Sequence, residues 1–135
     1  MSYLPQRIFV YGTLQPGGTY WRQFCEAKVK NVRAAKVRGQ LFDLHQGYPG
    51  ARFGGETWIQ GCVLSVLSEQ AFKNIDELEG YDPSRGHSEN EYTRVRIQYY
   101  DMDEIAQGQV WSYEINRHAL RRYQGSLIPG GIWPL

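Results

Sequence analysis

Two short segments of the chain carry groups that could do chemistry. Tyr11-Gly12-Thr13-Leu14 directly follows an apolar stretch over 7–10, and Glu79 stands directly before a glycine. A strand that stops at a glycine leaves backbone N–H groups without ladder partners, and such groups can bind an anionic or carbonyl oxygen. A carboxylate near a helix C-terminus and on its buried side has a raised pKa, as a general base working near neutral pH requires.

The helical spacing around Glu79 supports this interpretation. Ser68 can cap a helix from Glu69 to about Glu79, whose apolar residues recur every three or four positions. Glu79 comes four residues after Ile75, on the apolar face, whereas Asp76 and Glu77 are expected to face solvent. Two simpler alternatives stay open: Glu79 is the last charge of a solvated helix end, and the glycine loop is an ordinary turn.

The elements that must position these groups are mostly strands. Apolar and alternating patterns predict strands over 7–10, 29–44 (one or two strands, bent at Gly39), 57–67, 92–100 and 109–115. Helices are predicted over 19–27, 69–79 and 117–123, and a long glycine-rich loop over 45–56. The pattern favours an α+β fold: a small mixed, mainly antiparallel β-barrel with two or three flanking helices, in a single domain over residues 1–135.

Composition excludes several classes of function. The net charge of +1 gives no pull toward nucleic acid or membranes. Cys25 and Cys62 form no disulfide framework, and His45, His87 and His118 have no metal-ligand spacing. No phosphate-binding glycine motif is present. We therefore expect no metal and no cofactor, and a small-molecule substrate. The first residues carry no apolar leader, so we expect a cytoplasmic protein; the sequence does not indicate an oligomeric state.

Taken in order along the chain, these segments resemble the gamma-glutamylcyclotransferase-like family, in its AIG2-like branch. The resemblance covers nearly the whole chain. It rests on Tyr11-Gly12-Thr13-Leu14 with Gly17 behind it, Gly39 and Leu41, Gly47-Tyr48-Pro49, Gly61 and Val63, Ile75-Asp76-Glu77-Leu78-Glu79-Gly80, Tyr92-Thr93-Arg94, and Trp111-Ser112-Tyr113.

The resemblance implies a small mixed barrel and a non-hydrolytic cleavage of gamma-glutamyl amides. The alpha-amine of the glutamyl group attacks its own side-chain carbonyl, which releases 5-oxoproline and a free amine. It places the acid/base role on Glu79 and the binding of the glutamyl group on the loop over 11–14, with Tyr92, Arg94 and Tyr113 helping to order the substrate site. The loop over 80–90 is expected to shape the leaving-group pocket. The alternative is a binding or regulatory module that retains the fold without turnover.

Overall fold

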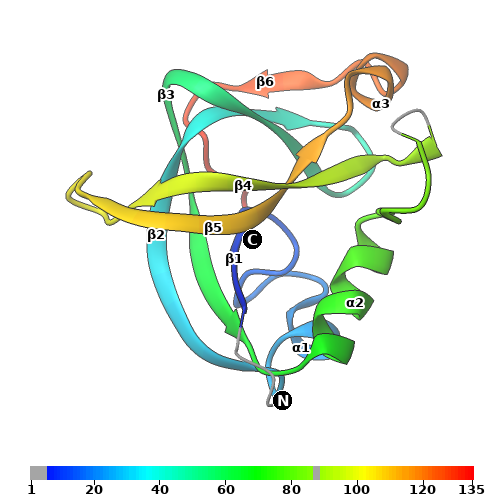
Figure 1. Ribbon diagram of the computed structural model, residues 1–135. Coiled ribbons are helices and arrows are strands. Elements are labelled where there is room, and N and C mark those ends of the chain that lie inside the picture. Colours follow the sequence, from blue (N-terminus) through cyan, green and yellow to red (C-terminus); the bar gives the residue numbers. More distant parts are fainter. Residues whose placement is uncertain (1–5, 87–88) are drawn as a thin grey trace.

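The computed structural model describes residues 6–86 and 89–135 (Figure 1). Residues 1–5 and His87 lie outside this part of the chain. The expectation that the first residues carry no leader therefore concerns residues outside the described ranges. The elements are, in chain order, β1 (Gln6–Val10), α1 (Trp21–Phe24), β2 (Val29–Asp43), β3 (Pro49–Val66), α2 (Glu69–Leu78), β4 (Tyr92–Tyr100), β5 (Ala106–Ile115), α3 (Arg117–Arg122) and β6 (Ser126–Ile128).

The strands form a barrel-like ring. Their order in the sheet is β3-β1-β5-β4-β2-β6, and β3 also pairs with β2, which closes the ring. β1 runs parallel to β5, with Ile8 opposite Trp111, and the other pairings are antiparallel. Figure 1 shows the long, curved β2 and β3 along one side and α2 beside the ring. The predicted α+β, mainly antiparallel fold with flanking helices is confirmed.

The alternation of side chains along β1 explains where the site forms. Ile8 and Val10 belong to a buried cluster that also contains Ile75 of α2, whereas Phe9 and Tyr11 belong to a second cluster on the opposite face. Successive side chains of a strand point to opposite faces, so β1 separates the two clusters. The loop over 11–14 begins where β1 ends. It therefore opens beside the side of the ring that α2 covers.

The predicted loop over 45–56 is wrong in its second half, because β3 already begins at Pro49. Residues 54–57 protrude from the strand: Arg38 pairs with Trp58, but the next residue, Gly39, pairs with Phe53. Gly54 and Gly55 take positive φ angles of 106° and 84°, which glycine adopts readily. The chain can therefore leave the pairing with β2 at these residues and resume it at Trp58. The bend expected at Gly39 coincides with this change of register.

Two other elements differ from their predictions. The helix expected over 19–27 is helical only over Trp21–Phe24, and turns make up the remainder. No strand is predicted beyond residue 115, but the C-terminal segment contains the short strand β6, which pairs with β2. The helix α2 agrees with its prediction, and the hydroxyl of Ser68 accepts the backbone N–H of Ala71 at 3.1 Å.

Candidate active site

One pocket of about 170 Å³ gathers the predicted site residues. Its lining comes from five parts of the chain that are distant in sequence: the end of β1 and the loop after it, the loop before β3, the end of α2, the start of β4, and β5. The lining residues are 9–14, Tyr20, Tyr48, Pro49, Leu78, Glu79, Glu91, Tyr92 and Tyr113. All the predicted site residues except Arg94 line this pocket.

The loop over 11–14 lines the pocket and carries backbone N–H groups that have no acceptor among the described residues. Its carbonyls are engaged: Gly12 O accepts the N–H of Gln15 at 3.2 Å, and Thr13 O accepts that of Tyr20 at 2.9 Å. Within residues 6–86 and 89–135, no protein group accepts the N–H of Gly12, Thr13 or Leu14. A side chain at Gly12 would place its Cβ 2.7 Å from Cδ of Pro49, so only glycine allows the two pocket walls this close approach.

Glu79 brings a partnerless carboxyl group into the pocket. It forms the C-cap of α2, where its backbone N–H donates to the carbonyl of Ile75 at 3.0 Å. In the part of the chain that the structure describes, its side chain makes no hydrogen bond or ion pair. Burial, and then the negative charges of Glu91 and Asp76, raise the pKa of Glu79 from 4.5 to about 8. A carboxyl with such a pKa exchanges protons near neutral pH.

A second carboxylate, that of Glu91, lines the same pocket and was missed by sequence reasoning. The hydroxyl of Tyr48 donates to Oε1 and Oε2 of Glu91 at 3.1 Å each, and the hydroxyl of Tyr123 donates to Oε1. The backbone N–H of Glu91 donates to the carbonyl of Gly80 at 3.3 Å, which places Glu91 beside the segment that carries Glu79. Its partners lie 43 and 32 residues away in sequence, so no local pattern could have revealed the cluster.

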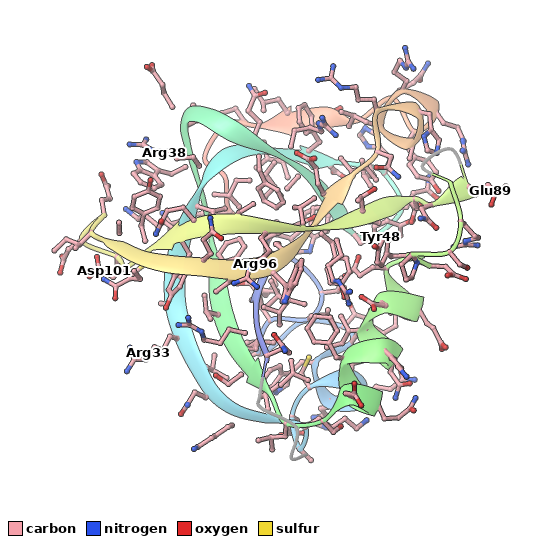
Figure 2. The ribbon with its side chains drawn as sticks, in the orientation of Figure 1. Arg33, Arg38, Tyr48, Glu89, Arg96 and Asp101 are labelled. Carbon is pink, nitrogen blue, oxygen red and sulfur yellow. The ribbon has the colours of Figure 1, made fainter. Side chains whose placement is uncertain are left out.

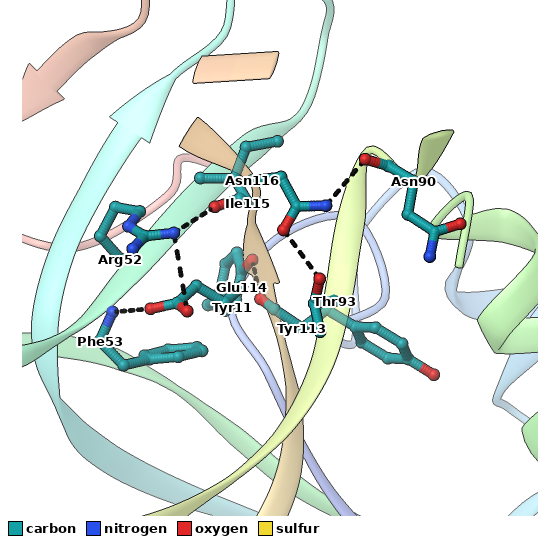
Figure 3. Close-up of polar contacts among 9 residues, drawn as sticks. All are labelled: Tyr11, Arg52, Phe53, Asn90, Thr93, Tyr113, Glu114, Ile115 and Asn116. Atoms are coloured by element: carbon teal, nitrogen blue, oxygen red, sulfur yellow. Dashed lines mark hydrogen bonds and ion pairs between the residues drawn. The ribbon is translucent and has the colours of Figure 1, made fainter. Parts of the chain in front are cut away.

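Two of the predicted tyrosines use their hydroxyl groups to hold the pocket walls together. Tyr11 donates to the carbonyl of Tyr113 at 2.6 Å (Figure 3), and Tyr92 donates to the carbonyl of Pro49 at 2.6 Å. Burial is the main cause that raises the pKa of both Tyr11 and Tyr92, so both hydroxyls stay protonated donors. They are engaged with the backbone and contribute their rings to the pocket.

Arg94 lies behind the pocket wall, beside a neighbouring groove that Phe72 and Trp111 also line. Its guanidinium pairs with Oδ2 of Asp76 at 2.9 Å, and Oδ1 of Asp76 accepts the hydroxyl of Tyr113, whose ring lines the pocket. The expectation that Asp76 faces solvent is wrong, since Asp76 is only 8% exposed. These partners compensate its charge, although burial still raises its pKa. Arg94 is therefore connected to the pocket indirectly: it pairs with Asp76, and Asp76 holds the hydroxyl of Tyr113, which lines the pocket.

The loop over 80–90 does not itself line the pocket in its described residues; Glu79 and Glu91, which flank it, do. Tyr81, Asp82 and Pro83 face the neighbouring groove instead. The described residues contain no group of three or more His, Cys, Asp or Glu arranged to hold a metal ion. No helix in the described ranges is long and apolar enough to cross a membrane.

The lining therefore combines two carboxylates, unpaired backbone N–H groups and tyrosine rings, and its described residues, drawn from 6–86 and 89–135, include no Lys, Arg, His, Ser or Cys. Such a pocket can bind a substrate oxygen or carboxylate on the backbone donors and move a proton through Glu79. The chemistry this arrangement allows is a proton transfer on a bound small molecule.

Comparison with known proteins agrees with this geometry. The family model described as gamma-glutamyl cyclotransferase, AIG2-like, matches residues 8–135. The gamma-L-glutamyl-butirosin B gamma-glutamyl cyclotransferase of Niallia circulans is 34% identical over 110 residues, which cover 82% of this chain and 67% of that protein.

Solved structures show the same fold. An AIG2-like protein from Mus musculus superimposes with a TM-score of 0.70 at 17% identity, over 98% of this chain and 90% of its own. YkqA from Bacillus subtilis superimposes with a TM-score of 0.67 at 20% identity over 96% of this chain, which spans only 40% of YkqA. The sequence matches and the shared fold lead to one conclusion: this chain belongs to the AIG2-like gamma-glutamyl cyclotransferase family of enzymes.

Proposed function

We propose that the protein releases 5-oxoproline and a free amine from gamma-glutamyl amines or peptides, with Glu79 as the general acid and base. One observation carries the proposal. The partnerless carboxyl of Glu79, with its pKa raised to about 8, lines the same pocket as the unpaired N–H groups of Gly12, Thr13 and Leu14. A proton carrier and a set of oxygen-binding donors are the two components that this intramolecular amide cleavage requires.

The proposed reaction rearranges bonds within the substrate and consumes no water. The neutral alpha-amine attacks the side-chain carbonyl carbon, and a new carbon–nitrogen bond closes the five-membered ring. Ionised Glu79 accepts the proton that this nitrogen loses. As the bond to the leaving nitrogen breaks, Glu79 returns the proton to that nitrogen, so the carboxylate is regenerated. Backbone N–H groups of the loop over 11–14 hold the folded glutamyl group and stabilise the oxyanion that forms on the carbonyl.

The comparisons support the substrate class. The Niallia circulans relative, by its name, acts on gamma-L-glutamyl-butirosin B, a gamma-glutamyl compound, and the matching family model is that of gamma-glutamyl cyclotransferases. The nucleophile of the proposed reaction belongs to the substrate, so a pocket whose described lining lacks Ser, Cys and Lys is sufficient for it.

The test is the replacement Glu79→Gln, which keeps the shape of the side chain and removes its ability to carry the proton. We expect 5-oxoproline release from a panel of gamma-glutamyl amides to fall by about a hundredfold or more. Glu77→Gln is the matched control, because Glu77 is exposed on the same helix and lies outside the pocket; its rate should stay close to that of the wild type.

A folded E79Q variant with the wild-type rate would overturn the role of Glu79. A wild-type protein that binds small carboxylates but releases no 5-oxoproline from any amide would overturn the enzymatic proposal. That second outcome would support a binding module that retains the fold.

A further inference from the structure

The ionisable acids and bases among the described lining residues of the pocket are unbalanced in favour of negative charge. Two carboxylates, Glu79 and Glu91, line it, and no basic side chain does among the residues that the structure describes. Among these described lining residues, a substrate carboxylate can find hydrogen-bond donors on the backbone of the loop over 11–14 or on a hydroxyl. A second anionic group on the same substrate would meet like charge without a compensating cation, and this disfavours such substrates.

Glu91 lies at the outer side of the pocket. Its two partners, Tyr48 and Tyr123, are partly exposed, whereas Tyr11, Leu14, Tyr92 and Tyr113 are at most 7% exposed. The glutamyl group must reach the loop over 11–14 at the buried side, and the leaving amine must extend toward solvent. Glu91 is thus next to the part of the substrate that varies from one gamma-glutamyl amide to another.

The carboxylate of Glu91 is held in place but retains hydrogen-bonding capacity. Among the described residues, Oε1 accepts from both tyrosine hydroxyls and Oε2 accepts from Tyr48 alone, whereas a carboxylate has about four acceptor positions. The backbone N–H of Glu91 donates to the carbonyl of Gly80, and the backbone N–H of Asn116 donates to the carbonyl of Glu91 at 2.9 Å, so the main chain is fixed on either side. The ring of Tyr48 lies 6.5 Å from that of Tyr92, and aromatic faces attract cations as well.

Resting on the proposed function, we propose that Glu91, positioned by Tyr48 and Tyr123, is a cation subsite for the leaving group. The substrates are then gamma-glutamyl amides whose leaving amine carries a second ammonium group, in preference to gamma-glutamyl amino acids or peptides that end in a carboxylate. The ammonium donates to Oε2 of Glu91 while the glutamyl group lies on the loop over 11–14.

The experiment uses three amides of matched length: gamma-glutamyl diaminopentane, gamma-glutamyl pentylamine and gamma-glutamyl aminohexanoate, which end in a cation, a methyl group and a carboxylate. For the wild type we expect kcat/KM to be about tenfold higher for the cationic than for the neutral amide, the size of one charge-assisted hydrogen bond, and lowest for the anionic amide. In Glu91→Gln the ratio of the cationic to the neutral amide should fall to near one.

Glu89→Gln is the matched control. It removes the same charge from the same segment, but Glu89 is exposed and lies at the outer edge of the molecule in Figure 2, away from Tyr48. Its ratio of cationic to neutral amide should equal that of the wild type. The ratio is the informative quantity, because removing the charge of Glu91 also changes the pKa of Glu79 and so affects all three amides alike.

Each of three other outcomes would overturn the cation subsite. Cleavage of all three amides with similar kcat/KM by the wild type overturns the cation subsite and leaves the proposed function standing; this result needs no variant and holds even if E91Q fails to fold. An equal loss on all three amides in E91Q leaves the cationic-to-neutral ratio at its wild-type value and so overturns the subsite, because Glu91 then acts on the reaction that the three amides share. If none of the amides yields 5-oxoproline, the proposed function itself fails, and the subsite with it.

Discussion

Replacing Glu79 by Gln should stabilise the folded protein at alkaline pH while it removes the proposed proton carrier. Burial and the charges of Glu91 and Asp76 oppose ionisation of Glu79, and raise its pKa from 4.5 to about 8. Gln has almost the same shape and no charge, so the variant keeps the packing and avoids the penalty. Under the proposed function, stability and activity therefore make opposite demands on this residue, as is common in active sites.

The direction and size of the effect follow from the two pKa values. Between about pH 4.5 and 8 the folded chain keeps a proton on Glu79 that the unfolded chain loses, so the free energy of unfolding of the wild type falls as pH rises. Below this range both states are protonated and there is no penalty. Above it the penalty is complete, and at about 1.4 kcal/mol per pH unit it reaches at most about 5 kcal/mol.

Urea denaturation of the wild type and E79Q, at about pH 5 and again at about pH 9, measures this difference. We expect E79Q to exceed the wild type in free energy of unfolding by several kcal/mol at the higher pH, and by much less at the lower. The exposed control E77Q should differ from the wild type equally at both. If the difference between E79Q and the wild type is the same at both pH values, the charge of Glu79 does not oppose folding and the reasoning is refuted.

Three further predictions concern the same pocket. The kcat/KM of the wild type for a gamma-glutamyl amide should rise with pH through about 8, because the reaction needs both ionised Glu79 and a neutral substrate amine; a profile that stays flat through this range would contradict the role of Glu79. Gly12→Ala should raise KM and lower the free energy of unfolding by about 1–3 kcal/mol, since its Cβ would lie 2.7 Å from Pro49 Cδ; unchanged KM and urea midpoint would show that the loop tolerates a side chain. Arg94→Met should destabilise the fold by about 1–3 kcal/mol at neutral pH and by less near pH 3, where Asp76 is protonated; urea denaturation at both pH values measures this, and an equal loss at both would exclude the ion pair as its cause.

The sequence could predict those parts of the site that depend on patterns among neighbouring residues. The position of Glu79 follows from the spacing of the apolar residues of α2, and that helix begins at a serine whose hydroxyl caps it as expected. The loop over 11–14 directly follows the short strand β1, which ends at Val10, two residues before Gly12. Each pattern needs only neighbours within one or two turns of chain, so no knowledge of the tertiary structure was required.

The parts that the sequence could not predict depend on partners far away in the chain. Asp76 follows the charged-face pattern of a solvated residue, but Arg94 of β4 and the hydroxyl of Tyr113 make its burial possible. Figure 3 shows another case: Arg52 pairs with Glu114 and donates to the carbonyl of Ile115, contacts that tie β3 to β5 across more than 60 residues. Long-range polar partners of this kind leave no periodic trace in the sequence.

The two tyrosine-to-carbonyl hydrogen bonds, from Tyr11 to Tyr113 and from Tyr92 to Pro49, have a consequence for the timing of events at the site. Each bond joins two walls of the pocket that come from different strands or loops, and each is made by protein groups alone. The width of the pocket is thus determined when the chain folds, before any substrate arrives. Substrate meets a preorganised cavity, so the entropy lost in ordering these walls does not weaken binding.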